Sequence, residues 1–262
     1  AVISEQYAGP GYFASRAESA PLAEGTTRVG NQKTVVMTNF AKKVEISKNL
    51  FDDDQHNTVQ RMITDLGRLA SLSQQKDALA VYNLGFTTQL PNDAEALFSN
   101  SHVRLGDAGT EDNLEVGTLT PANLETSINS LAKQRTQDGT LAIHLPNCLM
   151  VPIELFKEAQ EITKSELRPG TANNDLNYFS QIYPELQVKY SPFLSAREGG
   201  SDTAWFLLAQ NHQIWRWVRQ AIQTDLVDWR TQTNNAYIYK AEYREQAASI
   251  SYDGAVGSNG TV

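Results

Sequence analysis

The sequence predicts an α+β fold, and three observations support this fold class. Apolar residues recur at helical spacing in several stretches, other segments have strand propensity or alternate apolar and polar residues, and no regular strand–helix–strand succession appears. The chain shows no internal repeat and no coiled-coil heptad. With 262 residues, it is long enough for one large domain or two interlocked domains.

Residues 1–32 do not have the composition of a compact unit. They contain several glycines and prolines, many small residues and few large apolar ones, so the segment cannot offset its own ordering entropy. Tyr7, Tyr12 and Phe13 are the exceptions, and we expect them to anchor an extended arm on a neighbouring surface. The alternative is an unstructured terminus.

Residues 33–49 have a different character. Val35, Val36 and Met37 have strand propensity, and we add them to the expected subunit contacts. Val44 and Ile46 alternate with polar residues, which is typical of a half-exposed strand.

The clearest helix follows. Asp52, Asp53 and Asp54 are expected at its N-cap and first turn, where carboxylates suit the positive end of the helix dipole. The helix is expected to continue through Tyr82 and to stop at Gly85. Its apolar stripe contributes on the order of 10 kcal/mol before entropy if it is buried. The stripe consists of Val59, Met62, Ile63, Leu66, Leu69 and Ala70.

After a loop-rich stretch over residues 86–118, a second helix is expected. Thr120 supplies its N-cap and Pro121 its first position. Its apolar stripe is Leu124, Ile128 and Leu131.

An Asp138–Gly139 turn should then lead into a strand from Thr140 to Leu145 that buries His144. A second strand is expected over Cys148–Val151. A third helix should follow Pro152 and turn Leu155, Phe156, Ala159 and Ile162 inward.

Three further strands are expected in the second half of the chain. They are Leu186–Tyr190, Thr203–Ala209 and Ala236–Tyr243, the last with Tyr237, Tyr239 and Tyr243 on one face. The tail over residues 254–262 is rich in glycine and serine, and we expect it to be mobile.

Charge and reactive residues exclude several functions. A net charge of −8 and only small basic clusters argue against a surface that grips nucleic acid. The four histidines lack metal-ligand spacing, and Asp52–Asp54 lacks the rest of a calcium loop. Cys148 lies among apolar neighbours and is expected to be a buried thiol. We therefore predict no catalytic, cofactor-binding or metal-binding residue and no enzymatic activity.

Two further features bear on where the chain works. No apolar run approaches the roughly 18 residues that cross a bilayer, and a single cysteine fits folding in a cytoplasm. Ala1 is explained by removal of an initiator methionine or by proteolytic maturation.

Read in order, five stretches resemble tailed-phage major capsid proteins, and especially the phage Mu-like major head subunit family. The segment Phe98–Val103 differs from that family in having Val103 where proline is common. The likeness covers Phe40 to the end of the chain. The stretches are Asp52–Ala70 running into Ala78–Phe86, then Phe98–Val103, Thr120–Ile162, Ala204–Gln210 and Ile250–Gly260.

The resemblance implies the tailed-phage major capsid fold. It places an N-terminal arm and extended β-hairpin loop at residues 1–48 and the first part of a peripheral domain, with a spine helix, at 49–116. An axial domain would occupy residues 117–224, and 225–262 would return to the peripheral domain and form the tail.

The implied function is self-assembly in the host cytoplasm into the icosahedral shell of a virion. The implied partners are further copies in hexamers and pentamers, a portal, decoration proteins, and packaged double-stranded DNA bound without sequence specificity, with no membrane. Ala1 would then follow cleavage during head maturation. Three alternatives remain open: an encapsulin-like compartment, a soluble hydrolase with a cryptic site, and another virion protein such as a tail-tube or head-completion subunit.

Overall fold

The computed structural model describes residues 2–54, 57–90, 93–107, 109–167, 176–228, 230 and 235–261. The chain divides into two compact units and passes between them several times. Unit 1 comprises residues 1–2, 35–79 and 215–248, and unit 2 comprises residues 3–34, 80–214 and 249–262. Helices and strands are mixed in both units, so the predicted α+β class is confirmed.

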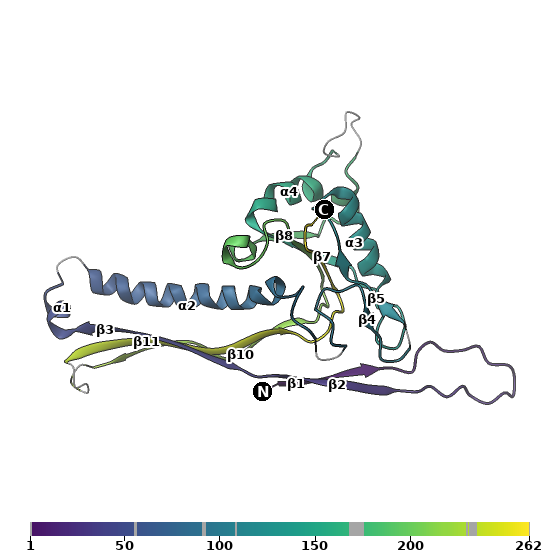
Figure 1. Ribbon diagram of the computed structural model, residues 1–262, viewed down its shortest axis with the longest axis horizontal. Coiled ribbons are helices and arrows are strands. Elements are labelled where there is room, and N and C mark those ends of the chain that lie inside the picture. Colours follow the sequence, from purple (N-terminus) through teal and green to yellow (C-terminus); the bar gives the residue numbers. More distant parts are fainter. Residues whose placement is uncertain are drawn as a thin grey trace. The chain divides into compact units, whose positions relative to one another are not determined.

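Unit 1 is built from one long helix and a three-stranded sheet. The sheet has the order β10-β11-β3, and β11 runs antiparallel to β3 with Tyr243 opposite Phe40. Helix α2 lies alongside these strands (Figure 1). Its elements are β3 (Thr38–Ser47), α1 (Lys48–Asp52), α2 (Thr58–Asn83), β10 (Ile214–Val227) and β11 (Ala236–Ser249).

The three acids before α2 do not act as one cap. Asp54 is the capping residue, because its two carboxylate oxygens accept hydrogen bonds from the amides of Thr58 and Val59, both at 3.0 Å. Asp52 instead ends the short helix α1 and pairs with Lys48, and Asp53 caps that helix at its C-terminus. The expectation that all three acids open the long helix was wrong, since a separate helical turn precedes it.

Unit 2 contains a five-stranded mixed sheet with the order β6-β12-β9-β7-β8. Every residue of β9 is buried, and the apolar side chains of the flanking helices complete a single core around it. The elements of this body are β6 (Leu114–Glu115), α3 (Pro121–Lys133), β7 (Pro146–Val151), α4 (Phe156–Lys164), α5 (Tyr178–Ile182), β8 (Gln187–Tyr190), β9 (Trp205–Ala209) and β12 (Ala255–Ser258).

Local signals predicted helices α3 and α4 of this body correctly, whereas the short helix α5 was not predicted. The Thr120 hydroxyl accepts a hydrogen bond from the Asn123 amide at 3.2 Å, and Pro121 opens α3. The expected stripe of α3 is buried, as are Ala159 and Ile162 of α4.

The predicted strand over Thr140–Leu145 was wrong, although its alternating pattern is real. Ile143 has a φ of +53°, which breaks an extended strand, and the segment makes only an isolated bridge between Arg135 and Leu141. His144 is buried, as expected, but Leu141, Ile143 and Leu145 face solvent. The actual strand begins at Pro146.

The prediction that residues 254–262 form a mobile tail was also wrong. Strand β12 lies between β6 and β9, and its four residues are all buried. Gln134 holds this segment, because its side chain accepts from the Gly254 amide at 3.0 Å and donates to the Ala255 carbonyl at 3.2 Å. Gly257 has no room for a side chain, since a Cβ atom would lie 2.6 Å from the Phe98 ring. Glycine here permits close packing.

Two smaller sheets complete unit 2. β4 (His102–Val103) pairs with β5 (Thr110–Glu111), and β1 (Val2–Ala8) pairs with β2 (Arg28–Val35). Residues 9–27 between β1 and β2 have no regular structure. The pair β1–β2 with the segment that joins them is called the hairpin below.

Candidate assembly surfaces

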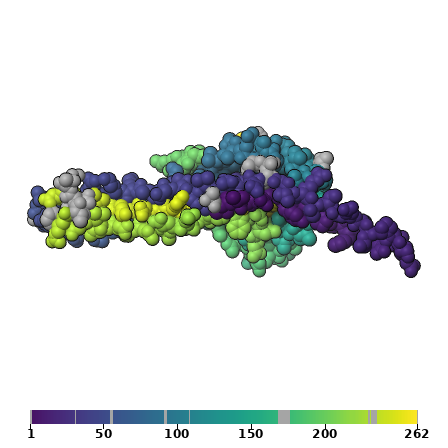
Figure 2. Space-filling view, turned by 90° about the horizontal axis from the view of Figure 1, so that it is seen from below, coloured from purple at the N-terminus to yellow at the C-terminus, as the bar shows by residue number. Residues whose placement is uncertain are grey.

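The hairpin has an anchored base and an exposed end. The Arg28 guanidinium donates to the Leu105 carbonyl at 3.3 Å, and the Leu141 amide donates to the Tyr12 hydroxyl at 2.8 Å. Lys33 also donates to the Ser249 carbonyl, and burial lowers the pKa of its ammonium group. Beyond these contacts, the purple end of the hairpin projects from the rest of unit 2 (Figure 2).

The six predicted contact residues fall into two groups. Tyr7, Tyr12, Phe13 and Val36 are exposed, and Phe13 is completely so. Val35 and Met37 are buried within this subunit. Leu22, which the sequence analysis did not single out, is 81% exposed. An apolar residue in a polar, structureless segment is the signal that would have found it.

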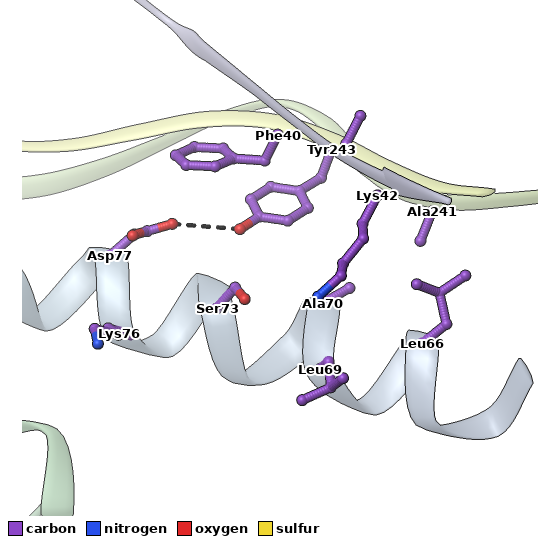
Figure 3. A pocket seen from close by; sticks show the side chains of 11 residues that line it. Phe40, Lys42, Leu66, Leu69, Ala70, Ser73, Lys76, Asp77, Ala241 and Tyr243 are labelled. Atoms are coloured by element: carbon purple, nitrogen blue, oxygen red, sulfur yellow. Dashed lines mark hydrogen bonds between the residues drawn. The ribbon is translucent and has the colours of Figure 1, made fainter. Parts of the chain in front are cut away.

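Unit 1 carries a groove between α2 and the sheet. Its volume is about 330 Å³, and it is lined by side chains of α2, β3 and β11 (Figure 3). Leu66 at its floor is buried, whereas Leu69, one helical turn further, is 41% exposed. The helix stripe that the sequence predicts is therefore only partly covered within one subunit.

One wall of the groove is aromatic. Phe40 stacks on Tyr243 with 4.8 Å between the ring centroids, and the Tyr243 hydroxyl donates to the Asp77 carboxylate at 3.3 Å (Figure 3). Burial, together with the negative charge of Asp77, raises the pKa of Tyr243 to about 12. The phenol stays neutral at physiological pH, so the aromatic wall itself carries no charge, whereas Lys42, Lys76 and Asp77 place charged groups elsewhere in the lining.

Two buried histidines of unit 2 make structural contacts. His102 lies between Asp93 and Asn113 at 2.7 and 3.1 Å and stacks on Tyr252. His144 is buried and lies 2.9 Å from Asn211, as expected for a hydrogen-bonded core histidine.

Cys148 is a buried thiol, as the sequence predicts. Burial raises its pKa, so the reactive thiolate is scarce at neutral pH.

Metal and membrane sites are not found in the described part of the chain. Within the residue ranges that the structure describes, no group of three or more histidine, cysteine, aspartate or glutamate residues could hold a metal ion. Among the helices of those same ranges, none has the length and apolar character to cross a membrane. His56 lies outside the described residues.

Comparison with known proteins identifies relatives of this architecture. The family described as phage capsid protein matches residues 31–256. No curated protein sequence matches the chain.

Solved structures share the fold at low sequence identity. The capsid of cyanophage Pam1 is 12% identical with a TM-score of 0.62, covering 98% of this chain and 84% of its own. The capsid of bacteriophage JBD30, decorated with minor capsid protein trimers, is 11% identical with a TM-score of 0.58, covering 74% and 86%. The SrpI encapsulin of Synechococcus elongatus PCC 7942 is 12% identical with a TM-score of 0.53, covering 90% and 78%.

Proposed function

The chain belongs to the phage capsid protein family, and we infer that, as the major capsid protein of a tailed phage, it forms the icosahedral shell and joins its copies through the hairpin. It is a structural protein and not an enzyme. Its place is the capsid of the virion.

The exposed apolar end of the hairpin carries this proposal. Phe13 and Leu22 present nearly their whole side chains to water in a segment without regular structure. Burying such a side chain is worth about 1.5–3 kcal/mol, and a closed shell multiplies each contact by the number of copies. In a shell, each copy has neighbouring copies, and their surfaces can cover the exposed side chains of its hairpin.

The groove of unit 1 is the proposed receiver of these side chains. Its lining is apolar at Leu66, Leu69 and Phe40, and its volume of about 330 Å³ accommodates an aromatic ring. An Ala70→Trp substitution would fill the groove while leaving the hairpin unchanged. Normal assembly of Ala70→Trp would exclude the groove as the receiver.

Assembly of hairpin variants tests the proposal. A Phe13→Ser and Leu22→Ser double variant should fold normally, because neither side chain is packed in the subunit, but should give few shells in negative-stain micrographs. Val116→Ser is a matched control, since Val116 is exposed in unit 2 outside the hairpin. Full shell yield from the double variant would contradict the role of the hairpin.

Finer assignments rest on the resemblance. We propose membership of the Mu-like major head subunit group, a portal as a further partner and packaging of double-stranded DNA without sequence-specific contacts. Decoration proteins are a further proposed partner, supported by the minor capsid protein trimers on the similar JBD30 capsid. The arm, peripheral and axial boundaries at residues 48, 116 and 224 also stay predictions.

A cargo compartment is the second candidate, because the SrpI encapsulin shares the fold over 90% of the chain. Purified particles discriminate the two functions. A phage shell yields nuclease-protected DNA after infection, whereas a compartment yields a co-purifying cargo protein and no DNA.

A further inference from the structure

An exposed apolar ridge precedes β7 in unit 2. It consists of Leu141, Ile143 and Leu145, which are 42%, 70% and 68% exposed. The residues between them turn the other way, since Ala142 is half-buried and His144 is buried. Three large apolar side chains are thus exposed to solvent within five residues of one irregular segment.

The backbone of the ridge is held in an unfavourable conformation. Ile143 has a φ of +53°, a region that β-branched residues rarely adopt and that glycine or asparagine adopts readily. Neighbouring contacts fix it: the Ala142 amide donates to the Gln134 carbonyl at 2.9 Å, and His144 lies 2.9 Å from Asn211. The Ile143 side chain is 70% exposed and so packs little on the described residues of the subunit, and the strain points to a use of this side chain outside the subunit.

A second apolar surface surrounds α5 in the same unit. Leu176, Tyr178 and Ile182 are 68%, 50% and 56% exposed, whereas Phe179 between them is buried in the core. We call these three exposed side chains the α5 patch. It lies on different elements from the ridge, so one copy of unit 2 carries two distinct apolar surfaces.

The charges that flank the two surfaces in the sequence differ in net sign. Exposed Lys133 and Arg135 and half-exposed Asp138 precede the ridge, which gives a positive balance. Exposed Glu166 and Glu185 flank the α5 patch and outnumber Lys164, whose ammonium group donates to the Pro184 carbonyl at 2.9 Å. Opposite charges at the rim favour one mutual orientation and disfavour contact between two ridges or between two patches.

From this arrangement, and resting on the proposed function, we propose that the ridge of one copy packs on the α5 patch of the next copy. The contact is heterologous, because two different surfaces of the same chain meet. Heterologous contacts repeated head to tail close into rings when the rotation permits. The ridge and the patch are therefore the proposed joint between neighbouring copies within one ring of the shell.

Cross-linking between two variants tests the contact directly. Particles are assembled from a mixture of Ile143→Cys copies and Ile182→Cys copies and treated with a short bismaleimide. The native Cys148 is buried and stays silent. We expect cross-linked dimers from the mixture, but neither from Ile143→Cys alone nor from a control mixture of Ile143→Cys with Val116→Cys. Well-formed particles without the mixed dimer, or dimers from Ile143→Cys alone, would overturn the proposal.

An Ile143→Asn variant separates assembly from folding. Asparagine tolerates the positive φ, so the unassembled subunit should melt at the same temperature as the unsubstituted protein or higher. Shell yield should fall at least tenfold, and the charge reversal Lys133→Glu should be rescued in part by Glu166→Lys on the partner copy. Full yield from Ile143→Asn would refute the ridge while leaving the proposed function intact. Failure of the unsubstituted chain to form shells would instead refute the proposed function.

Discussion

A Gly257→Ala substitution should destabilise unit 2 severely for a change of one methyl group. The added Cβ atom would lie 2.6, 2.7 and 2.8 Å from three atoms of the Phe98 ring, where ordinary contact begins near 3.4 Å. A Cβ at Gly85 would also lie 2.7 Å from the same ring. Phe98 thus packs closely on two glycines from distant parts of the chain, and this close packing is called the clamp below.

The size of the effect follows from this clamp. Overpacking a well-filled core costs about 1–3 kcal/mol. Phe98 is buried and packs against Phe86 and Phe206, with ring centroids 5.2 and 5.3 Å away, so relaxation is limited and we expect the upper end of that range. For a chain of this size, that corresponds to a fall in melting temperature of roughly 5–10 °C.

Urea and thermal unfolding of the unassembled subunit measure the change. Gly67→Ala is the matched control, since a Cβ added at Gly67 would meet no atom within 4 Å and the exchange in a helix interior should stabilise by ~1 kcal/mol. Phe98→Leu in the Gly257→Ala background should recover part of the loss, giving a coupling energy in a double-mutant cycle. Equal melting of Gly257→Ala and the unsubstituted chain would refute the clamp.

Three further predictions concern unit 1 and the C-terminal segment. Leu66→Asp should lower the free energy of unfolding by several kcal/mol, because it buries an unpaired charge, whereas Leu69→Asp at a half-exposed position should lower it much less. Equal losses in urea unfolding would show that α2 is rotated from its described position. Asp54→Ala should lose about 0.5–2 kcal/mol by removing the cap of α2, and Asp54→Asn should retain most of it; identical thermal melts of all three proteins would rule out the cap. Burial raises the pKa of Asp253, so the folded chain loses stability as pH rises from about 4 through that pKa; Asp253→Asn should be more stable than the parent at pH 7, and the gain should shrink at pH 4. A gain that does not change between these pH values would contradict the assignment.

The elements that the sequence predicts correctly are those fixed by residues close together in the chain. Helices α2, α3 and α4 are set by apolar residues at helical spacing and by caps such as Thr120, all of which act within a few residues. The strand β10 was not predicted, because it lies at the edge of its sheet and both of its faces are largely exposed, so apolar and polar residues do not alternate cleanly along it. The groove was not predicted either, since Leu66 and Tyr243 meet only after long-range pairing of β11 with β3.

The C-terminal strand shows why composition misleads. Glycine and serine near residue 257 suggested mobility, yet Gly257 is required for close packing on Phe98, and the Ser258 hydroxyl donates to the Gly117 carbonyl at 2.7 Å. Both contacts join residues more than a hundred positions apart, and no pattern within the segment reveals them. Glycine and serine favour disorder where no other part of the chain packs on them, and they permit dense packing where another part of the chain does.

The exposed apolar residues point to a different cause of misreading. Leu141, Ile143 and Leu145 alternate as a buried strand would, and Phe13 is as apolar as a core residue, yet all are exposed in the single subunit. On the proposed function, these side chains are buried in the shell, so an apolar pattern predicts burial in the assembled state rather than in one chain. Hydrophobic burial is insensitive to whether the covering atoms belong to the same chain or the next one. Residues for which the sequence predicts burial and the subunit shows exposure are therefore the first positions to test for contacts between copies.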